Sequence, residues 1–446
     1  MEALYSNRYR LHPAVFYRCY DDLVVVYHTG RQAVLTLNKS AGDILDFFRT
    51  YASMDELIDS IARNYESQNI MSFKDDIEGF VSELIEKDIL IVEYKQKEVY
   101  DNLESEISSH LSVEKPLYTV TIELTYKCNE KCRHCYIVDE NRKELSTDEI
   151  KRILDELAEM GVFSLVFTGG EVFLRKDAFE ILEYAYANGF LFEIFTNGTL
   201  INGNDYIRLK RLWPKCGHFS LYSYQQDKHD SITRVKGSFQ KTLRSIKACR
   251  DIGIPVNIKT PLFAETYKDI HGLVALANSL RASIELGDNI TPKKNGDLSP
   301  TKMKADDEDH TYIDKAISEL IEKSYTGSIA AKDRICGAGE RSISINPYGD
   351  VYPCSMLQLC IGNVTKESLR DIWTDSKQLK LWQSQNHHQN KRGCEGCELL
   401  DRCIFCPGEA MMRTGDPLAK YDEACQKTKR AIEKEKVELQ GGGELK

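Results

Sequence analysis

The sequence predicts an α/β protein built on a mostly parallel sheet, either open or barrel-like. Between residues 116 and 290, β-like runs alternate with helix-like segments, and the region holds six expected strands and ends on the last of them. Strands that alternate with helices in this way favour a parallel sheet. The functional loops of such a sheet lie at the carboxyl ends of its strands.

The elements of this central region follow in a regular order. The expected strands cover residues 118–124, 164–168, 190–196, 218–223, 255–260 and 283–287. The first helix begins with a capping box of Ser146 and Glu149, carries apolar residues on one face, and stops at Gly161. Further helices are expected at 178–188, 204–213, 238–252 and 269–280.

The flanking regions follow other patterns and set the expected domain boundaries. Residues 1–95 mix short β-like runs with amphipathic helical stretches, which predicts a small β-hairpin with helices. Residues 96–115 form a polar linker, and 291–333 connect the central region to the next one. Residues 334–428 are rich in cysteine and are expected to fold around metal more than around an apolar core, and 429–446 form a charged tail.

The composition is typical of a globular protein. The chain has 446 residues, of which 42% are hydrophobic and 29% charged, and its net charge of -10 argues against broad nucleic-acid binding. It has no apolar run that could span a bilayer and no secretory signal at the N-terminus. We therefore expect a cytoplasmic protein with neither a membrane nor a nucleic-acid partner.

Eleven of the 14 cysteines gather in two regions. Because the cytosol keeps thiols reduced, such clustering indicates metal binding instead of disulfides. Cys19, Cys216 and Cys249 stand apart, and we interpret them as small buried hydrophobic residues.

Three cysteines, Cys128, Cys132 and Cys135, follow the first expected strand with CX3CX2C spacing. Three thiolates can hold a four-iron cube and leave one iron open for a small-molecule ligand. The alternative is a structural zinc site completed by His134, although this histidine lies between two of the cysteines.

This motif resembles the signature of radical SAM enzymes, which implies a partial (β/α)6 TIM-like barrel whose [4Fe-4S] cluster binds S-adenosyl-L-methionine (SAM). The sequence TGGE resembles the family's Gly-Gly-Glu motif and implies that Gly169, Gly170 and Glu171 meet the methionine amino group. The backbone of His134 is expected to meet the adenine. The sequence SLYS resembles the element that reaches the ribose, which implies Ser220 and Ser223, but Tyr222 replaces the family's usual acid. We assign no catalytic residue beyond these cofactor ligands.

The C-terminal cysteines resemble the SPASM extension of radical SAM peptide-modifying enzymes, which implies two auxiliary [4Fe-4S] clusters and three clusters in all. By position, one cluster would be held by Cys394, Cys397, Cys403 and Cys425. The other would be held by Cys336, Cys354 and Cys406, one ligand short. Cys360 either completes this second set or leaves an open iron for a substrate thiolate. A zinc ribbon is the alternative for the CX2C pairs.

The N-terminal region resembles the winged-helix-like element that binds leader peptides in many peptide maturases. Taken together, these resemblances imply an enzyme that installs thioether cross-links in a ribosomal precursor peptide, as in sactipeptide and ranthipeptide biosynthesis. The expected partners are that precursor with its leader sequence and an electron donor such as flavodoxin or ferredoxin. A carbon–carbon cross-linking maturase, a sulfatase-type maturase and a non-catalytic metal-binding peptide scaffold stay open as alternatives.

Overall fold

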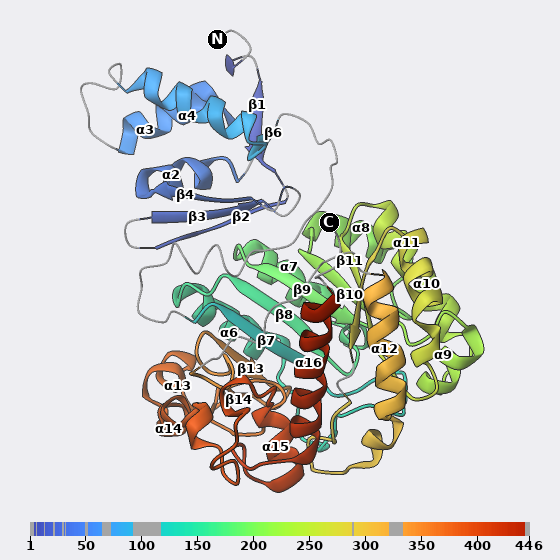
Figure 1. Cartoon of the computed structure of the whole chain (residues 1–446). Helices are drawn as coiled ribbons and strands as arrows, with labels where there is room; N and C mark the ends of the chain where they lie inside the picture. Colours follow the sequence, from blue (N-terminus) through green and yellow to red (C-terminus); the bar gives the residue numbers. More distant parts are fainter. Residues whose placement is uncertain are drawn as a thin grey trace.

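The computed structural model describes residues 4–91 with short gaps, 117–287, 290–320 and 333–441. The gaps in the first range are residue 6, residue 13, 21–22, 29–30, 32, 50–51 and 65–72. The expected linker at 96–115 lies outside the described residues. An N-terminal lobe and the cysteine-rich region lie at opposite ends of a central α/β body (Figure 1).

The central body is a large sheet with strand order β12-β11-β10-β9-β8-β7-β13-β14-β15. Its six consecutive parallel strands confirm the α/β prediction: β7 (Thr119–Thr125), β8 (Ser164–Gly169), β9 (Leu191–Thr196), β10 (Cys216–Ser220), β11 (Val256–Pro261) and β12 (Ser283–Gly287). The cysteine-rich region extends this sheet, because β13 (Ser342–Ile345) pairs parallel to β7 and is followed by antiparallel β14 (Asp350–Tyr352) and β15 (Gly362–Asn363). The sequence pattern does not predict this extension.

Helices cross between the parallel strands: α6 (Thr147–Glu159), α7 (Ala178–Ala187), α8 (Asn204–Leu212), α10 (Ser238–Asp251) and α11 (Ile270–Ser279). The capping box of Ser146 and Glu149 is present at the start of α6, and Gly161 follows its end with a φ of 75°. The short helix α9 (Gln226–Thr233) is an element that the periodicity does not predict. Alternate strand residues such as Ile122, Phe167 and Ile258 pack against the helices, so the intervening residues face the concave side of the sheet.

The N-terminal lobe contains two small sheets and three helices among its described residues. One sheet has the order β2-β3-β4 and the other β5-β1-β6. The strands are β1 (Arg8–Leu11), β2 (Val15–Cys19), β3 (Leu23–His28), β4 (Ala33–Asn38), β5 (Ala52–Ser53) and β6 (Leu90–Ile91). The helices are α2 (Lys39–Phe47), α3 (Met54–Asn64) and α4 (Lys74–Glu86). The predicted hairpin with helices is therefore present, enlarged by a second sheet.

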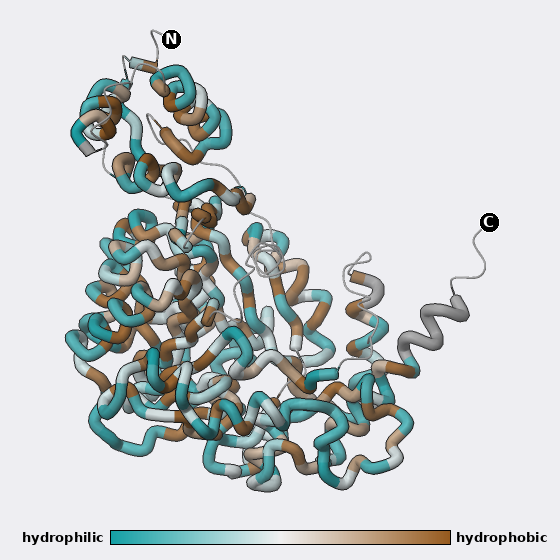
Figure 2. Tube along the Cα trace, turned by 90° about the vertical axis from the view of Figure 1, so that its left-hand side faces the viewer, coloured by the Kyte–Doolittle hydropathy of each residue, from teal (hydrophilic) through white to brown (hydrophobic). Residues whose placement is uncertain are grey.

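The lobe contacts the body at the amino ends of the parallel strands. Phe16 and Tyr27 of the lobe share a buried cluster with Phe163 and Leu191, which lie at the starts of β8 and β9. Arg18 lies 4.8 Å from the ring centroid of Phe190. In Figure 2 the lobe stands apart from the body and joins it through a small contact region. The lobe therefore lies opposite the carboxyl-end loops that carry the cysteine motif.

The cysteine-rich region has its own helices and an apolar core. Its helices are α13 (Leu369–Asp375), α14 (Lys377–Gln385), α15 (Pro407–Thr414) and α16 (Asp422–Gly441), and the helix α12 (Asp307–Leu320) precedes them in the chain. Ile345, Leu369 and Trp382 are almost fully buried and belong to the same core as the barrel strands. This region therefore also has an apolar core, because β13 brings its hydrophobic residues against the large sheet, and the expectation that it folds mainly around metal stays a prediction. Among the described residues, no helix is long and apolar enough to cross a membrane.

Candidate functional site

Three thiols converge in the loop that follows β7. Cys132 is half-buried, and its Sγ lies 3.4 Å from a carboxylate oxygen of Glu130. Cys128 accepts a hydrogen bond from the amide of Glu130 at 3.4 Å. The amide of Cys135 donates to the carbonyl of Cys132 at 3.2 Å, so the chain turns within the predicted triplet.

This thiol group fits a metal cluster better than it fits free cysteines. Burial raises the pKa of Cys128 to about 11 and also raises the pKa of Cys132 and Cys135. The neighbouring carboxylates of Glu130 and Glu171 raise the pKa of Cys128 further. Three thiolates here need a compensating cation, and bound metal ions supply it because coordination deprotonates thiols. The soft sulfur donors match an iron–sulfur cube.

Gly169 and Gly170 bring the loops after β7 and β8 into contact. A Cβ atom on Gly169 would lie 2.2 Å from the carbonyl oxygen of Thr125, and one on Gly170 would lie 2.3 Å from that of Lys127. The amide of Gly170 donates to Thr125 at 2.7 Å, and that of Glu171 donates to Lys127 at 3.0 Å. The glycine pair therefore packs directly against the backbone of the cysteine loop. The contact with the methionine amino group of SAM that the resemblance implies stays a prediction.

Glu171 organises the third loop of the site. Its side chain is buried and accepts hydrogen bonds from the Thr196 hydroxyl and the Asn197 amide, each at 2.7 Å, and from the Phe173 amide at 3.1 Å. The side chain of Asn197 then donates to Asn129, inside the cysteine motif, at 3.0 Å. This chain of bonds links the loops after β7, β8 and β9. Asn197 belongs to TNGT at 196–199, which the family resemblance expects after the third strand, whereas the sequence does not single out Asn129.

An aromatic group packs beside Cys132. The His134 ring lies 4.6 Å from the Tyr222 ring and 5.0 Å from the Phe263 ring. Burial lowers the pKa of His134 to about 4, and its Nδ1 is buried without a hydrogen-bond partner among the residues that the structure describes. The Tyr222 hydroxyl lies 3.9 Å from Sγ of Cys132. The ring of His134 thus packs among aromatic side chains, and its predicted backbone contact with adenine stays a prediction.

The two predicted ribose serines have different surroundings. Ser220 ends β10 and is half-buried, with its hydroxyl near Tyr222. Ser223 is fully buried, donates to Asp269, and accepts from the amide of Gln225 at 3.0 Å. Lys228 also pairs with Asp269, at 2.8 Å. Ser220 is therefore better placed than Ser223 to meet a cofactor.

The C-terminal cysteines influence one another within the two sets that the resemblance implies, and their roles as cluster ligands stay predictions. The charges of Cys354 and Cys406 both act on Cys336, which defines one group. Cys394 is influenced in the same way by the members of the other group, Cys397, Cys403 and Cys425. Cys360 is exposed, and its thiol donates to the carbonyl of Gly362 at 3.3 Å. Its predicted role as a ligand stays open, and the first group gathers three thiols without it.

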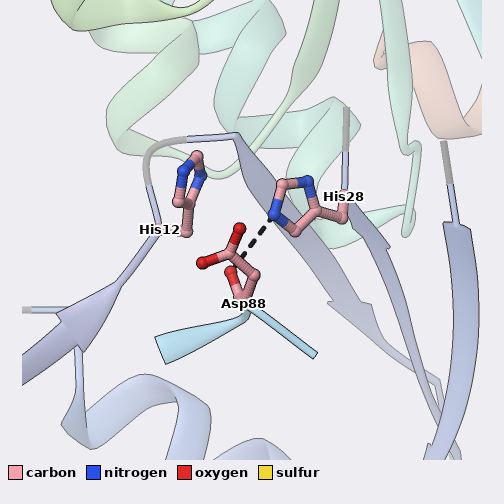
Figure 3. Close-up of side chains that lie close together, drawn as sticks. All are labelled: His12, His28 and Asp88. Carbon is pink, nitrogen blue, oxygen red and sulfur yellow. Dashed lines mark hydrogen bonds between the residues drawn. The ribbon is translucent and has the colours of Figure 1, made fainter. Parts of the chain in front are cut away.

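A different group of potential metal ligands lies in the N-terminal lobe. His12, His28 and Asp88 have ligand atoms within 4.8 Å of one another (Figure 3). The amide of Ala14 donates to Nδ1 of His12 at 2.9 Å, so this ring carries its proton on Nε2. Nε2 of His28 donates to the backbone carbonyl of Asp88 at 3.1 Å. If Nε2 of His12 bound a metal, its Nδ1 would carry a proton, and this proton would face the N–H of Ala14. We therefore interpret the group as a structural contact that holds the ends of neighbouring strands together.

Comparison with known families agrees with this geometry. Residues 122–277 match the Radical SAM superfamily, and residues 336–398 match the SPASM iron–sulfur cluster-binding domain. The chain is a radical SAM enzyme with a SPASM domain. Its cofactors are accordingly a SAM-binding [4Fe-4S] cluster and auxiliary iron–sulfur clusters.

The relatives include a bacteriocin biosynthesis protein, a heme synthase and a protein whose structure contains a precursor peptide. The chain is 32% identical over 305 residues to the antilisterial bacteriocin subtilosin biosynthesis protein AlbA of Bacillus subtilis, which covers 65% of each protein. It is 28% identical to the AdoMet-dependent heme synthase of Methanosarcina barkeri, over 66% of this chain and 93% of that protein. The structure of Streptococcus suis SuiB bound to the precursor peptide SuiA matches with a TM-score of 0.57 and 18% identity, and covers 94% of this chain and 100% of that one.

Proposed function

We propose that this enzyme matures a ribosomally made precursor peptide and joins a cysteine sulfur of that peptide to a carbon atom. The first auxiliary group carries the thioether proposal. Its three thiols, Cys336, Cys354 and Cys406, lie together, while Cys360 is exposed and bonded elsewhere. A four-iron cube with three protein thiolates has one iron left for an external ligand, and a peptide thiolate fits that position. The similarity to the subtilosin biosynthesis protein supports the same assignment.

When its cofactors are bound, the site supplies reductive cleavage of SAM to methionine and a 5′-deoxyadenosyl radical. The chain's own residues hold that site. Gly169 and Gly170 fix the spacing between two loops, and Glu171 and Asn197 bond the third loop to them. Because these bonds are buried, they keep the site rigid while the radical is present.

We further propose that the N-terminal lobe is a winged-helix-like element that binds the leader peptide. Within the described residues, β4 pairs with β3 alone and forms an edge of its sheet. Its residues are half-buried or exposed, whereas β2 packs toward the body through Phe16. An extended leader can add to such an edge as another strand through backbone hydrogen bonds. The precursor-bound SuiB structure, which shares this fold, supports a peptide partner.

A carbon–carbon cross-link is the second candidate, because the barrel and the cysteine groups serve either bond. The heme synthase relative keeps a non-peptide substrate open as a different class. A sulfatase-type maturase would have less need for the N-terminal lobe. A non-catalytic scaffold would have no need for glycines at 169 and 170 that position a cofactor loop. Flavodoxin or ferredoxin remains the proposed electron donor.

The test is an anaerobic reaction with reconstituted enzyme, SAM, dithionite and short cysteine-containing peptides encoded beside its gene. We expect 5′-deoxyadenosine and a peptide lighter by two hydrogens whose joined cysteine resists alkylation. A product with the same mass loss but fully alkylated cysteines would replace the thioether by a carbon–carbon bond. If 5′-deoxyadenosine forms but every peptide keeps its mass, the peptide-maturase proposal fails.

A further inference from the structure

The concave side of the sheet carries a polar row directly below the cofactor loops. Phe195 of β9 pairs in register with His218 of β10, and His218 pairs with Asn257 of β11. Phe195 immediately precedes Thr196, which bonds to Glu171. The neighbouring Ile194, Phe219 and Ile258 face the helices, so this row faces the other side, inside the barrel. His218 also lies two residues before Ser220, the predicted ribose contact.

A carboxylate fixes the state of His218. Nε2 of His218 lies 2.6 Å from a carboxylate oxygen of Glu193, and Lys215 bonds the other oxygen at 2.6 Å. Although burial alone would raise it, the pKa of Glu193 is lowered to about 2 by the bond from His218 and the charge of Lys215. A carboxylate only accepts hydrogen bonds, so Nε2 carries the proton and Nδ1 keeps its lone pair. Glu193 thereby makes Nδ1 the basic nitrogen of this ring.

The basic nitrogen is buried and lacks a partner in the part of the chain that the structure describes. His218 is 7% exposed, and its Nδ1 finds no hydrogen bond among the described residues. Oδ1 of Asn257, the next residue in the row, is also buried and unpartnered. The ring of Phe195 stacks on His218 at 4.2 Å and 18°, which restrains the imidazole. Buried polar atoms normally have partners, so these two neighbouring atoms are free to bond a water molecule or a substrate group.

The other buried histidines near the site lack this arrangement. His229 has an unpartnered Nε2, but its Nδ1 accepts from the Tyr222 amide at 3.2 Å, so Nε2 carries the proton and can only donate. His134 packs among aromatic rings, and no carboxylate bonds it among the described residues. Of these three histidines, in the part of the chain that the structure describes, His218 alone combines a carboxylate on one nitrogen with a buried lone pair on the other.

We propose that His218 is the base that accepts the proton of the substrate group that is cross-linked, and that Glu193 is its positioning residue. This inference rests on the proposed function. Thioether formation breaks one C–H and one S–H bond and forms one S–C bond. The hydrogen atom leaves on 5′-deoxyadenosine, the thiol proton goes to Nδ1 of His218, and the remaining electron goes to an oxidised iron–sulfur cluster. Imidazole suits this step, because histidine is the side chain that most often serves as a general base.

The test compares His218→Gln and Glu193→Gln with native enzyme, using the precursor that native enzyme converts in the experiment above. The matched controls are His271→Gln and Glu183→Gln. Native His271 is an exposed histidine of α11, and native Glu183 accepts a hydrogen bond from Arg208 on the surface. A lost general base typically costs about 100-fold or more. We expect His218→Gln to form 5′-deoxyadenosine at near-native rate but cross-links at least about 100-fold more slowly, and Glu193→Gln to fall between it and native enzyme.

A pH series separates a lost base from damaged packing. In His218→Gln, cross-linking should recover with rising pH as the thiol ionises near its ordinary pKa of about 8.5. A packing defect would lower both products at every pH and would overturn the proposal. Equal cross-linking by native enzyme and His218→Gln would also overturn it and leave the proposed function intact.

A second measurement needs no peptide. Side-chain 15N NMR of histidine-labelled enzyme, assigned with His218→Gln, should show His218 protonated at Nε2 and not at Nδ1. A proton on Nδ1 would overturn the proposal even if no peptide is converted. If no peptide is converted but the His218 proton lies on Nε2, the result counts against the proposed function and not against this inference.

Discussion

Lys294 forms a buried ion pair whose loss should destabilise the barrel. Its Nζ lies 2.8 Å from both carboxylate oxygens of Glu123 and 2.7 Å from the hydroxyl of Tyr126. The side chains of Lys294 and Glu123 are 7% and 1% exposed. The Lys294→Met substitution leaves the carboxylate buried with Tyr126 as its remaining donor among the described residues. Removing one partner of such a pair costs about 3–5 kcal/mol.

We expect urea unfolding under anaerobic conditions to show this loss in Lys294→Met. A loss of about 4 kcal/mol lowers the folded-to-unfolded ratio several hundred-fold. The double variant Lys294→Met/Glu123→Leu should recover much of the loss, because it leaves no buried charge. Lys293→Met is the matched control: its pair with Asp297 is exposed, so its loss should stay within about 1 kcal/mol. The reasoning is refuted if Lys294→Met is as stable as the control, or if the double variant is less stable than the single one.

Three further predictions concern the cofactor and peptide sites. Native reconstituted enzyme should hold about twelve irons if it carries three four-iron cubes. Replacing Cys128, Cys132 and Cys135 with alanine should remove about four of these irons and abolish SAM cleavage. Persistent SAM cleavage in this triple variant would contradict the proposed cluster site. Gly170→Ala should displace the cysteine loop and lower SAM binding at least about tenfold by calorimetry, because its Cβ would lie 2.3 Å from the Lys127 carbonyl oxygen; native affinity would show that the loops can separate. Deleting residues 1–95 should weaken precursor binding, measured by fluorescence anisotropy, but spare SAM cleavage in the absence of peptide. Some stability should be lost, because the deletion exposes Phe163. Unchanged peptide affinity would rule out the lobe as the recognition element.

The local pattern of the sequence determined the strand–helix alternation and the first cofactor motif. The capping box of Ser146 and Glu149 and the turn at Gly161 are short-range signals, so α6 could be placed without any tertiary information. The CX3CX2C motif spans only eight residues, so a turn within one loop is enough to bring its three thiols together. The grouping of the C-terminal cysteines into two ligand sets follows only from their resemblance to a known pattern and stays a prediction, although burial and the other thiols of the set raise the pKa of Cys336 in one set and of Cys394 in the other.

Only the tertiary structure decided the long-range contacts. Glu193 and His218 are 25 residues apart and meet because β9 and β10 pair in parallel, and Lys294 reaches Glu123 across 171 residues. The cysteine-rich region acquires its apolar core because β13 pairs with β7, which no periodicity within that region reveals. The docking of the N-terminal lobe on the amino ends of the strands likewise depends on surface complementarity between distant segments. Sequence periodicity reports which face of an element is apolar, whereas the choice of partner for that face depends on packing over the whole chain.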